Sequence, residues 1–506
     1  MLSKSYSYGI IGLNAFLITI ETDINKGMPA TTIVGLPDNA IKESKERVRS
    51  AIKNSGYPFE SRKITINLSP ADIKKEGPSF DLAMALGILT GLEHVILPNL
   101  HKFAILGELS LDGKVKPVKG CLSVSMAAHA DNFEGLIVPA ENAEEAAIFS
   151  KTKIFPVRTL NEAIQVIENI TDRPPYTPLP KTEKPNQYFV DFSEVKGQRH
   201  VKRGLEVASA GGHNILMIGP PGSGKSMLAQ RIPTILPDMT WEESMETTQI
   251  HSISGLLQKD TGLVSYRPFR SPHHTTSSAA IVGGGTIPRP GEITLSHNGV
   301  LFLDEFPEFN RTVIESLRQP MEDHVVTIAR AANVLKFPAK FMLVCAMNPC
   351  PCGHLSDQKK TCRCSQLQVE KYLSRISGPI LDRIDIHLDV PALDTTSLLK
   401  TGDEEPSLEI KKRTENAREI QKNRFKKELT FANAFMSARQ IKKHCEINED
   451  SKSLLKHAIE ELNLSARAYN KILKLSRTIA DLDGQEHLQT QHIAEAIQYR
   501  SLDRKW

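Results

Sequence analysis

The sequence predicts an α/β fold in three parts: a mixed α+β block, a block of alternating strands and helices, and an all-helical block. Between residues 188 and 395, apolar runs such as NILMIG, GVLFLDE and KFMLVCAMN alternate with amphipathic helical stretches, a pattern typical of a mostly parallel sheet. Residues 396–506 repeat apolar positions at helical spacing. Residues 1–172 mix both patterns, and the proline-rich stretch 173–187 is predicted to be an extended linker.

Composition narrows the class of protein only in part. The 506 residues include 63 basic and 59 acidic ones, a net charge of +4 that permits nucleic-acid binding without arguing for it. No stretch approaches about 20 consecutive apolar residues, so we expect no membrane span. The N-terminal run lacks a clear small-residue cleavage site and reads as a pair of β-strands. We therefore expect a cytoplasmic protein.

A glycine-rich loop follows the first apolar strand of the middle block. The residues GPPGSGKS fit the spacing G-x-x-x-x-G-K-S, with a strand before them and a helix after them. Glycines let backbone N–H groups wrap phosphates, and the helix N-terminus adds partial positive charge. We expect Lys225 to reach the terminal phosphates of ATP and Ser226 to ligate Mg²⁺. The predicted nucleotide-binding residues are Gly219, Pro220, Pro221, Gly222, Ser223, Gly224, Lys225, Ser226 and Met227.

Two carboxylates, Asp304 and Glu305, end the next strand, GVLFLDE. Paired acids are costly to bury without partners, so a simple buried strand is excluded. Asp304 is predicted to hold Mg²⁺, directly or through water, and Glu305 to orient and polarise the attacking water. Asn348 ends the third strand, and its place in the chain predicts that it reaches the γ-phosphate or its water. Together these residues predict ATP hydrolysis.

Four of the seven cysteines are packed into NPCPCGHLSDQKKTCRCSQ, in an insertion at residues 348–366. They are Cys350, Cys352, Cys362 and Cys364. Four thiolates can close a tetrahedral zinc site, although C-x-C pairs are tighter than usual zinc spacings and His354 could replace one thiolate. The alternative is four reduced thiols on a loop, which would be an oxidation liability at this density. We expect a structural Zn²⁺, because a full set of protein ligands leaves no open position.

Two stretches between these motifs have a composition suited to a substrate. RPFRSPHHTTSSAAIVGGG, residues 267–285, joins basic side chains and an aromatic ring to a run of small residues. Arginine and histidine beside an aromatic suit phosphate contact with base stacking, while the alternative is a solvated loop that packs between subunits. VVTIARAANVLKF, residues 325–337, reads as a β-hairpin. The predicted DNA contacts are Arg267, Phe269, Arg270, His273, His274 and, near the hairpin tip, Arg330.

Several longer motifs span the chain: GPPGSGKS, RPFRSPHHTTSSAAIVGGG, GVLFLDEFPEF, LRQPMED, AMNPCPCG, LDRIDIH and SARAYNKILKLSRTIADL. Their order resembles that of AAA+ ATPases, and more narrowly the magnesium-chelatase-like branch that contains the bacterial YifB/ComM family. The resemblance covers essentially the whole chain. It implies an AAA+ P-loop module with a C-terminal helical lid, and a homohexameric ring that hydrolyses ATP between subunits. It also implies DNA branch migration in natural transformation, with recombination proteins as candidate partners.

The same resemblance assigns roles to three further positions. Asn348 resembles sensor 1, Arg383 in LDRIDIH the arginine finger supplied to a neighbour's ATP, and Arg467 in LSARAYN sensor 2 on the lid. A fixed guanidinium stabilises the charge that builds on phosphoryl oxygens in the transition state. Arg375 lies eight residues before Arg383 and competes for the finger role. The alternatives are a surface salt bridge for Arg383 and a charge on a helix face for Arg467.

The first block resembles the proteolytic domain of Lon, through KKEGPSFDLAMALGIL and GELSLDGKVKPVKGCLSVSMAAHADNFEGLIVP. Ser79 matches the position of the nucleophilic serine of Lon. Leu122 stands where Lon has its activating lysine, and Lys119 lies three residues away on a turn. A serine hydroxyl without a general base is a poor nucleophile, so we expect a Lon-like fold without peptidase chemistry and Ser79 as a helix N-cap.

Three classes of function remain. The leading interpretation is a motor that remodels single-stranded or branched DNA and whose ATPase is stimulated by it. The second is an AAA+ protein remodeller or a magnesium-chelatase-type chaperone, in which the same ATPase domain acts on a protein client. The third, an ATP-dependent Lon-like protease, is disfavoured by Leu122.

Overall fold

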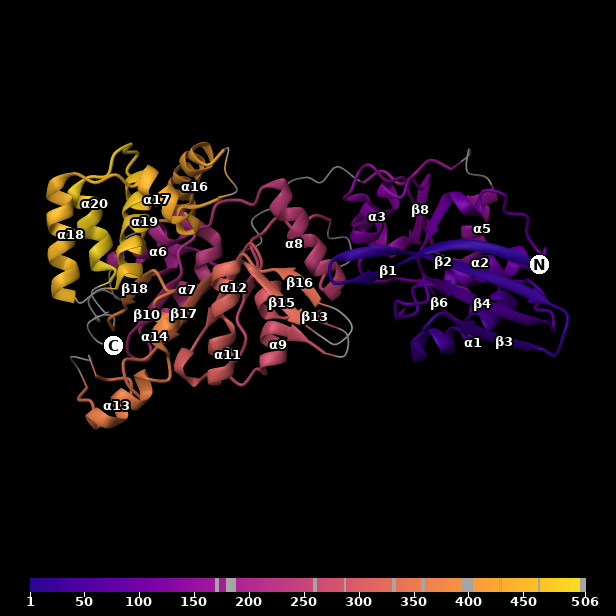
Figure 1. Ribbon diagram of the computed structural model, residues 1–506, viewed down its shortest axis with the longest axis horizontal. Helices are drawn as coiled ribbons and strands as arrows, with labels where there is room; N and C mark the ends of the chain where they lie inside the picture. The colour runs from indigo at the N-terminus through magenta and orange to yellow at the C-terminus, as the bar shows by residue number, and fades with distance from the viewer. Residues whose placement is uncertain are drawn as a thin grey trace. The chain divides into compact units, whose positions relative to one another are not determined.

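The computed structural model divides the chain into two compact units (Figure 1). It describes residues 1–168, 173–178, 188–257, 262–285, 288–329, 334–355, 360–392, 404–426, 428, 430–462 and 465–500. The first unit comprises Met1–Glu183 with Ser244–Val264, and the second comprises Lys184–Glu243 with Ser265–Trp506. The boundaries expected at residues 172, 187 and 395 lie outside the described residues.

A seven-stranded mixed sheet organises the first unit, with strand order β3-β4-β2-β1-β5-β8-β9. The strands are β1 (Leu2–Ile11), β2 (Asn14–Asn25), β3 (Ala30–Val34), β4 (Lys63–Ser69), β5 (Phe103–Ile105), β8 (Gly135–Pro139) and β9 (Ile154–Val157). The predicted N-terminal strand pair is confirmed, because β1 and β2 are antiparallel with Leu2 opposite Asp23. Ile18, Ile20 and Ile24 of β2 are buried at even spacing, as a strand with one face on a core requires.

Helices pack on this sheet and complete the first unit. They are α1 (Asn39–Asn54), α2 (Asp81–Gly91), α3 (Cys121–Ala130), α4 (Ala143–Ala147) and α5 (Leu160–Glu168), with a small hairpin of β6 (Glu108–Leu109) and β7 (Val115–Lys116). The expectation that Ser79 caps a helix is wrong: the N-cap of α2 is Phe80, with no side-chain cap hydrogen bond. Ser79 instead accepts a hydrogen bond at its carbonyl from Gly107 N–H. Leu122 is fully buried in α3.

A five-stranded parallel sheet organises the second unit, in the order β11-β14-β17-β10-β18. Its strands are β10 (Ile215–Ile218), β11 (Phe269–Arg270), β14 (Val300–Leu303), β17 (Met342–Met347) and β18 (Ile386–Asp389). The three strands that the sequence predicted are β10, β14 and β17, and they are neighbours in the sheet. Because the strands are parallel, their carboxyl ends meet at one edge, which is where ligands bind in open α/β sheets.

Helices and short hairpins surround this sheet. They are α6 (Arg199–Gly211), α7 (Lys225–Ile235), α9 (Ser278–Val282), α10 (Glu292–Leu295), α11 (Arg311–Ser316), α12 (Arg318–Asp323), α13 (Gln366–Leu373) and α14 (Gly378–Leu381), with the hairpins β12 (Gly283–Gly284)/β13 (Arg289–Pro290) and β15 (Val325–Ala329)/β16 (Val334–Pro338). The hairpin predicted at residues 325–337 is confirmed, because Val325 pairs with Pro338 and Ala329 with Val334. Its predicted tip residue, Arg330, lies outside the described residues.

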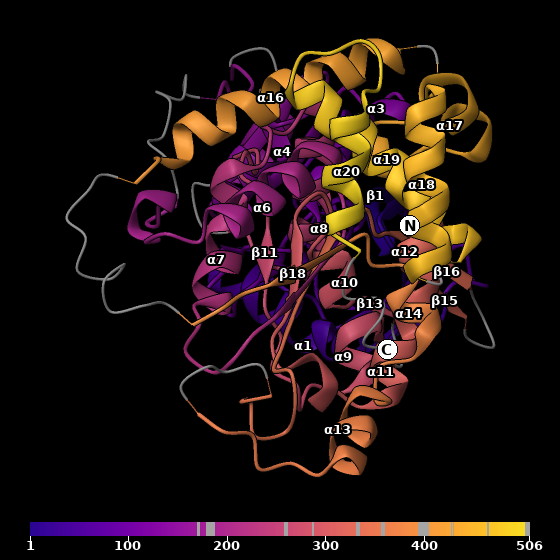
Figure 2. The ribbon, with the colours of Figure 1, turned by 90° about the vertical axis from the view of Figure 1, so that its left-hand side faces the viewer.

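The C-terminal part of the second unit is the predicted helical lid (Figure 2). Its helices are α16 (Ser407–Arg424), α17 (Ala438–His444), α18 (Glu449–Leu462), α19 (Ala466–Leu482) and α20 (Thr490–Gln498). Buried residues of α19, such as Leu475 and Ile479, belong to the same hydrophobic core as Val207 of α6 and Ile215 of β10. Burial of such side chains stabilises by about 1.5–3 kcal/mol each, so the lid is attached to the sheet by its core.

One helix, α8 (Trp241–Ser254), carries the chain from the second unit into the first. Gln249 of α8 donates hydrogen bonds to the Leu13 carbonyl, at 2.8 Å, and to Ser123 Oγ, at 3.0 Å. Ser252 donates to the buried carboxylate of Glu145. The first unit is therefore built from two separate stretches of sequence, which the sequence analysis did not foresee. No helix in the described part of the chain is long and apolar enough to cross a membrane.

Candidate active site

The glycine-rich loop lies between β10 and α7, at the carboxyl edge of the sheet. Gly222 and Gly224 have φ of +76° and +89°, which a side chain rarely tolerates. These conformations turn the chain so that α7 begins at Lys225 with its first N–H groups facing the loop. Ser223 is buried, and its Oγ is a polar atom without a hydrogen-bond partner among the described residues. The loop has the backbone shape and donors that fit a phosphate chain.

Lys225 connects the loop to the third strand. Its Nζ donates to the carbonyls of Gly219, at 2.7 Å, and Pro220, at 2.9 Å, and to Asn348 Oδ1 at 3.3 Å. Burial lowers the pKa of Lys225, and the nearby charge of Asp304 opposes this shift. The structure thus brings Lys225 and Asn348 together, as the chain order predicted.

Ser226 and Asp304 form the second contact of the site. Ser226 Oγ donates to Asp304 Oδ2 at 2.6 Å, and the backbone N–H of Glu305 donates to Asp304 Oδ1 at 2.9 Å. A hydroxyl and a carboxylate oxygen are ligands that Mg²⁺ accepts, so this pair fits the ion together with nucleotide phosphates.

Glu305 and His274 make a contact that the sequence analysis missed. Glu305 has a φ of 51°, its side chain is 58% exposed, and its Oε2 lies 3.2 Å from Nδ1 of His274. The ring of His274 also lies against that of His273, with centroids 4.1 Å apart. A sequence pattern could have predicted this contact, because the histidines directly follow the strand-like run RPFR. In the structure that run forms β11, which pairs with β14. With residues 267–285 interpreted as one loop, the ends of β11 and β14 were not expected to meet at the same edge of the sheet.

Arg267, Phe269 and Arg270 contact residues of the protein itself, and the DNA contacts expected at these positions stay predictions. The guanidinium of Arg267 donates to the carbonyls of Pro237, Asp238 and Asn298 and to Glu243 Oε2, which occupies its donors inside the fold. Phe269 packs on the core beside Phe302. Arg270 forms a two-bond ion pair with Glu292, at 2.6 and 2.8 Å. Among the predicted DNA contacts that are described, His273 is exposed and His274 half-buried.

The three predicted arginines differ in their surroundings. Arg383 lies between α14 and β18, where its Nη2 pairs with Glu322 Oε1 at 2.5 Å and its Nη1 donates to the Pro379 carbonyl at 2.6 Å. Arg375 pairs with Glu308 at 2.6 Å, and half of its side chain is exposed. Arg467 is exposed in the first turn of α19.

The four clustered thiols form a candidate metal centre. All four Sγ atoms lie within 4.8 Å of one another, and the distances Cys350–Cys352, Cys350–Cys362 and Cys352–Cys362 are 3.4, 3.7 and 3.6 Å. A tetrahedron of sulfurs around zinc has edges of about 3.8 Å. Backbone N–H groups of Leu355 and His354 reach Cys350, and those of Arg363 and His354 reach Cys352. Burial raises the pKa of Cys350 to about 12, whereas these amides lower the pKa of Cys352 to about 6. The donor set and spacing fit zinc.

This cluster adjoins the nucleotide loop. A Cβ on Gly353, whose φ is +82°, would lie 2.5 Å from Cδ of Pro221, so the cysteine loop packs directly on the glycine-rich loop. Just beyond the cluster, Tyr372 of α13 accepts a hydrogen bond from the backbone N–H of Asn348. The cysteine loop therefore packs on Pro221, and the helix that follows it, α13, contacts the backbone at Asn348.

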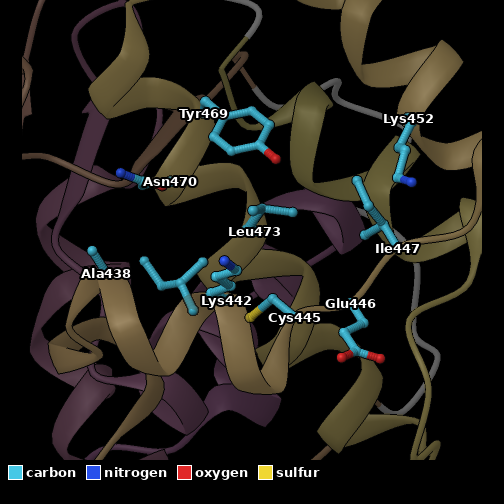
Figure 3. Close-up of a pocket in the computed structure, with 10 residues that line it drawn as sticks. Ala438, Lys442, Cys445, Glu446, Ile447, Lys452, Tyr469, Asn470 and Leu473 are labelled. Carbon is cyan, nitrogen blue, oxygen red and sulfur yellow. The ribbon is translucent and has the colours of Figure 1, made fainter.

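A separate hollow of about 510 Å³ lies in the lid (Figure 3). Residues of α17, such as Lys442, and of α19, such as Tyr469 and Leu473, face it from different sides. Its described lining contains none of the predicted site residues, so we assign it no part in the site.

Three family models match the chain in order. Residues 20–142 match "Subunit ChlI of Mg-chelatase", residues 191–398 match "Magnesium chelatase, subunit ChlI", and residues 404–500 match "Magnesium chelatase, subunit ChlI C-terminal". The glycine-rich loop, the acid pair and the cysteine cluster all fall within the second match.

Curated relatives match over nearly the whole length. The chain is 42% identical to the competence protein ComM of Haemophilus influenzae, over 99% of this chain and 97% of that protein. It is 41% identical to YifB of Escherichia coli, described as uncharacterized, over 99% of this chain and 98% of that protein. A partial match, 26% identical over 162 residues, is to the Lon protease of Trichlorobacter lovleyi, covering 30% of this chain and 20% of that protein.

Proposed function

The chain belongs to the magnesium-chelatase-like family of AAA+ ATPases that includes ComM and YifB, and we propose that it is a ring-forming motor that uses ATP hydrolysis to remodel DNA. The observation that carries this proposal is the pair of contacts at one sheet edge: Lys225 with Asn348, and Ser226 with Asp304. A P-loop lysine, a magnesium-ligating hydroxyl and acid, and a polar strand-end residue are the parts that phosphoryl transfer from ATP requires.

Each residue has a task in this mechanism. Lys225 neutralises charge on the terminal phosphates, and Ser226 and Asp304 hold Mg²⁺. Bound Mg²⁺ supplies positive charge against the phosphoryl oxygens. Glu305 accepts the proton of the attacking water, which requires its carboxylate to leave His274. Asn348 fixes the position of the γ-phosphate or of the water.

The proposal of a ring rests on an arginine that a neighbouring subunit would supply to this ATP site. We assign the finger to Arg383, which would leave Glu322 and enter the ATP site of the next subunit. A guanidinium fixed on the transferring group stabilises the transition state, so a lone subunit would hydrolyse ATP poorly. Arg375 is the competing candidate and would have to leave Glu308. Arg467 would act as sensor 2, from the lid.

We also propose that the four cysteines hold one structural zinc ion. The sulfur spacing matches a tetrahedral site, and N–H donors from the backbone surround two of the thiols. By fixing the loop that contacts Pro221 and leads from Asn348, the ion would hold the glycine-rich loop and the third strand in register.

DNA as the substrate is supported by the near full-length identity to a competence protein. Branch migration in natural transformation is the specific role we propose, with single-stranded or branched DNA as the track. The first unit contributes no peptidase chemistry in this proposal, because buried Leu122 offers no base for Ser79.

An ATPase assay with and without DNA tests this function. We expect hydrolysis to rise on adding single-stranded or branched DNA, and the effect to weaken with salt, since phosphate contacts release counterions. Glu305→Gln supplies the background rate. If the wild-type protein hydrolyses ATP but neither binds DNA nor responds to it at low salt, the track is not DNA, and a protein client becomes the better proposal.

A further inference from the structure

The segment that carries Arg383 is attached to the lid immediately after that residue. Three contacts make the attachment: Arg500 Nη1 donates to the Ile384 carbonyl at 2.6 Å, Lys471 Nζ lies 2.8 Å from Asp385 Oδ1, and His387 N–H donates to the Tyr499 carbonyl at 2.9 Å. Lys471 lies on α19, and Tyr499 and Arg500 follow α20. The start of β18 is thereby held against two lid helices.

Asp385 is the centre of this attachment. Only 8% of Asp385 is exposed, and its Oδ2 accepts a hydrogen bond from Asn214 N–H at 3.0 Å. The side-chain amide of Asn214 in turn donates to the carbonyl of Arg383 at 3.2 Å. A shift of Asp385 would therefore disturb the backbone at Arg383.

Lys471 is the cation that compensates Asp385. His213 Nδ1 lies 3.7 Å from Asp385 Oδ2, but burial lowers the pKa of His213, so its ring is neutral near pH 7. Burial also lowers the pKa of Lys471, to about 8, which leaves most of it charged at neutral pH. Lys471 in turn holds the pKa of Asp385 well below its ordinary value, against the effect of burial. A buried ion pair contributes little net stability, because burying both charges costs free energy. Stability alone therefore does not explain this pair.

The pair lies between the two predicted catalytic arginines. Lys471 is four residues after Arg467 on α19, one helical turn along the same face. Asp385 is two residues after Arg383. One ion pair thus connects the helix that carries the predicted sensor-2 arginine, Arg467, to the segment that carries the predicted arginine finger, Arg383.

We propose that Lys471 and Asp385 are positioning residues that fix Arg383 for catalysis in the neighbouring subunit. The inference rests on the proposed ring with its finger in trans. In this arrangement Lys471 touches neither nucleotide nor water; it acts through Asp385 and the backbone of the finger segment.

The test replaces Lys471 by Met, which keeps length but removes charge. Lys471→Met should bind ATP with affinity within about two-fold of the wild type, while kcat falls on the order of 10²-fold, as expected for a displaced catalytic group. Lys471→Arg should recover much of the rate. Lys452→Met is the control, since Lys452 lies on the lid helix α18 and pairs with Glu449 of the same helix. Where Lys471→Met does not fold, the double variant Asp385→Asn/Lys471→Met removes both buried charges.

Subunit mixing separates positioning from a general defect. Lys471→Met mixed with Lys225→Ala should regain hydrolysis, because the second variant supplies an intact finger to the intact ATP site of the first. Lys471→Met mixed with Arg383→Ala should stay inactive. Wild-type kcat in Lys471→Met, or rescue by Arg383→Ala instead, would overturn the proposal. A parallel mixture of Arg383→Ala with Lys225→Ala tests the ring: recovery there without recovery for Lys471→Met refutes the role of Lys471 alone, and no recovery in either refutes the finger in trans and this inference with it.

Discussion

The carboxylate of Glu305 and the imidazole of His274 are in direct contact, with Oε2 3.2 Å from Nδ1. Glu305 also has a left-handed backbone conformation, with a φ of 51°, which costs free energy in a residue with a side chain. The residue proposed to activate water is therefore held by a group from the neighbouring strand end. His274 is in a position to control when Glu305 is available.

His274→Ala should raise the basal rate of ATP hydrolysis. The Glu305 side chain is 58% exposed, and an exposed ion pair contributes about 0.2–1 kcal/mol, so losing the contact would raise the rate by up to about five-fold if release of Glu305 limits it. His273→Ala tests the stacked ring separately, because His273 contacts Thr275 and the ring of His274, whereas the contact with Glu305 is made by His274. Steady-state ATPase rates without DNA measure the effect. A fall in rate for His274→Ala alone would instead mean that His274 orients Glu305 for chemistry.

Lys225→Ala and Glu305→Gln should fail at different steps. Lys225→Ala removes the charge that neutralises the terminal phosphates, so nucleotide binding should be lost or strongly weakened. Glu305→Gln should keep ATP affinity yet hydrolyse about 10²–10⁴-fold more slowly, since an amide cannot accept the proton of water. Equilibrium binding and single-turnover hydrolysis distinguish the two defects. Substantial turnover by both variants would remove the assignment of this site.

Arg267→Ala should destabilise the second unit rather than selectively weaken DNA binding. Its guanidinium serves three carbonyls and Glu243 in a half-buried setting, so we expect a loss of about 2 kcal/mol or more. Arg270→Ala should cost less, because its single partner, Glu292, is partly exposed. Thermal unfolding gives the order. Unchanged stability together with weakened DNA binding in Arg267→Ala would restore a direct contact with DNA.

Mixed rings should recover activity that each variant lacks alone. Arg383→Ala keeps an intact ATP site, and Lys225→Ala keeps an intact finger, so some interfaces in a mixture are complete. Hydrolysis should peak at intermediate mixing ratios. The same titration with Arg375→Ala decides between the two finger candidates, because only the true finger variant complements. Confirmed subunit exchange without any recovered activity would argue against catalysis in trans.

About one zinc ion per chain should copurify with the protein. Cys362→Ser should lose the metal, since three thiolates and a hydroxyl bind zinc less strongly than four thiolates. Cys445→Ser is the matched control, because Cys445 is a buried free cysteine of the lid, outside the cluster. Elemental analysis of both variants and a thiol-release assay with a chelator provide the readout. A metal-free preparation that is folded and fully active would refute the zinc site.

Local sequence patterns were enough to predict which strands and loops form the site. They did not predict which side chains contact one another across those elements. The glycine-rich motif located Lys225, and apolar runs ending in polar residues located Asp304 and Asn348, because parallel strands bring their carboxyl ends together. The roles expected of Arg267 and His274 came from composition, which cannot tell a guanidinium that serves the fold from one that serves a ligand. That distinction depends on acceptors distant in sequence, such as Asn298, which no local pattern reveals.

The insertion of residues 244–264 into the first unit sets a limit on how the protein can be dissected. A fragment that stops at residue 183 lacks Ser252, a donor to the buried carboxylate of Glu145, and the Gln249 contacts to β-hairpin and α3. A fragment that starts there instead keeps Ile250, fully buried in the intact chain, without the strands and helices of its own unit. Neither half can be excised with a single cut. An isolated first unit would need residues 244–264 joined back onto it. An isolated second unit would need the same stretch replaced by a short hydrophilic linker.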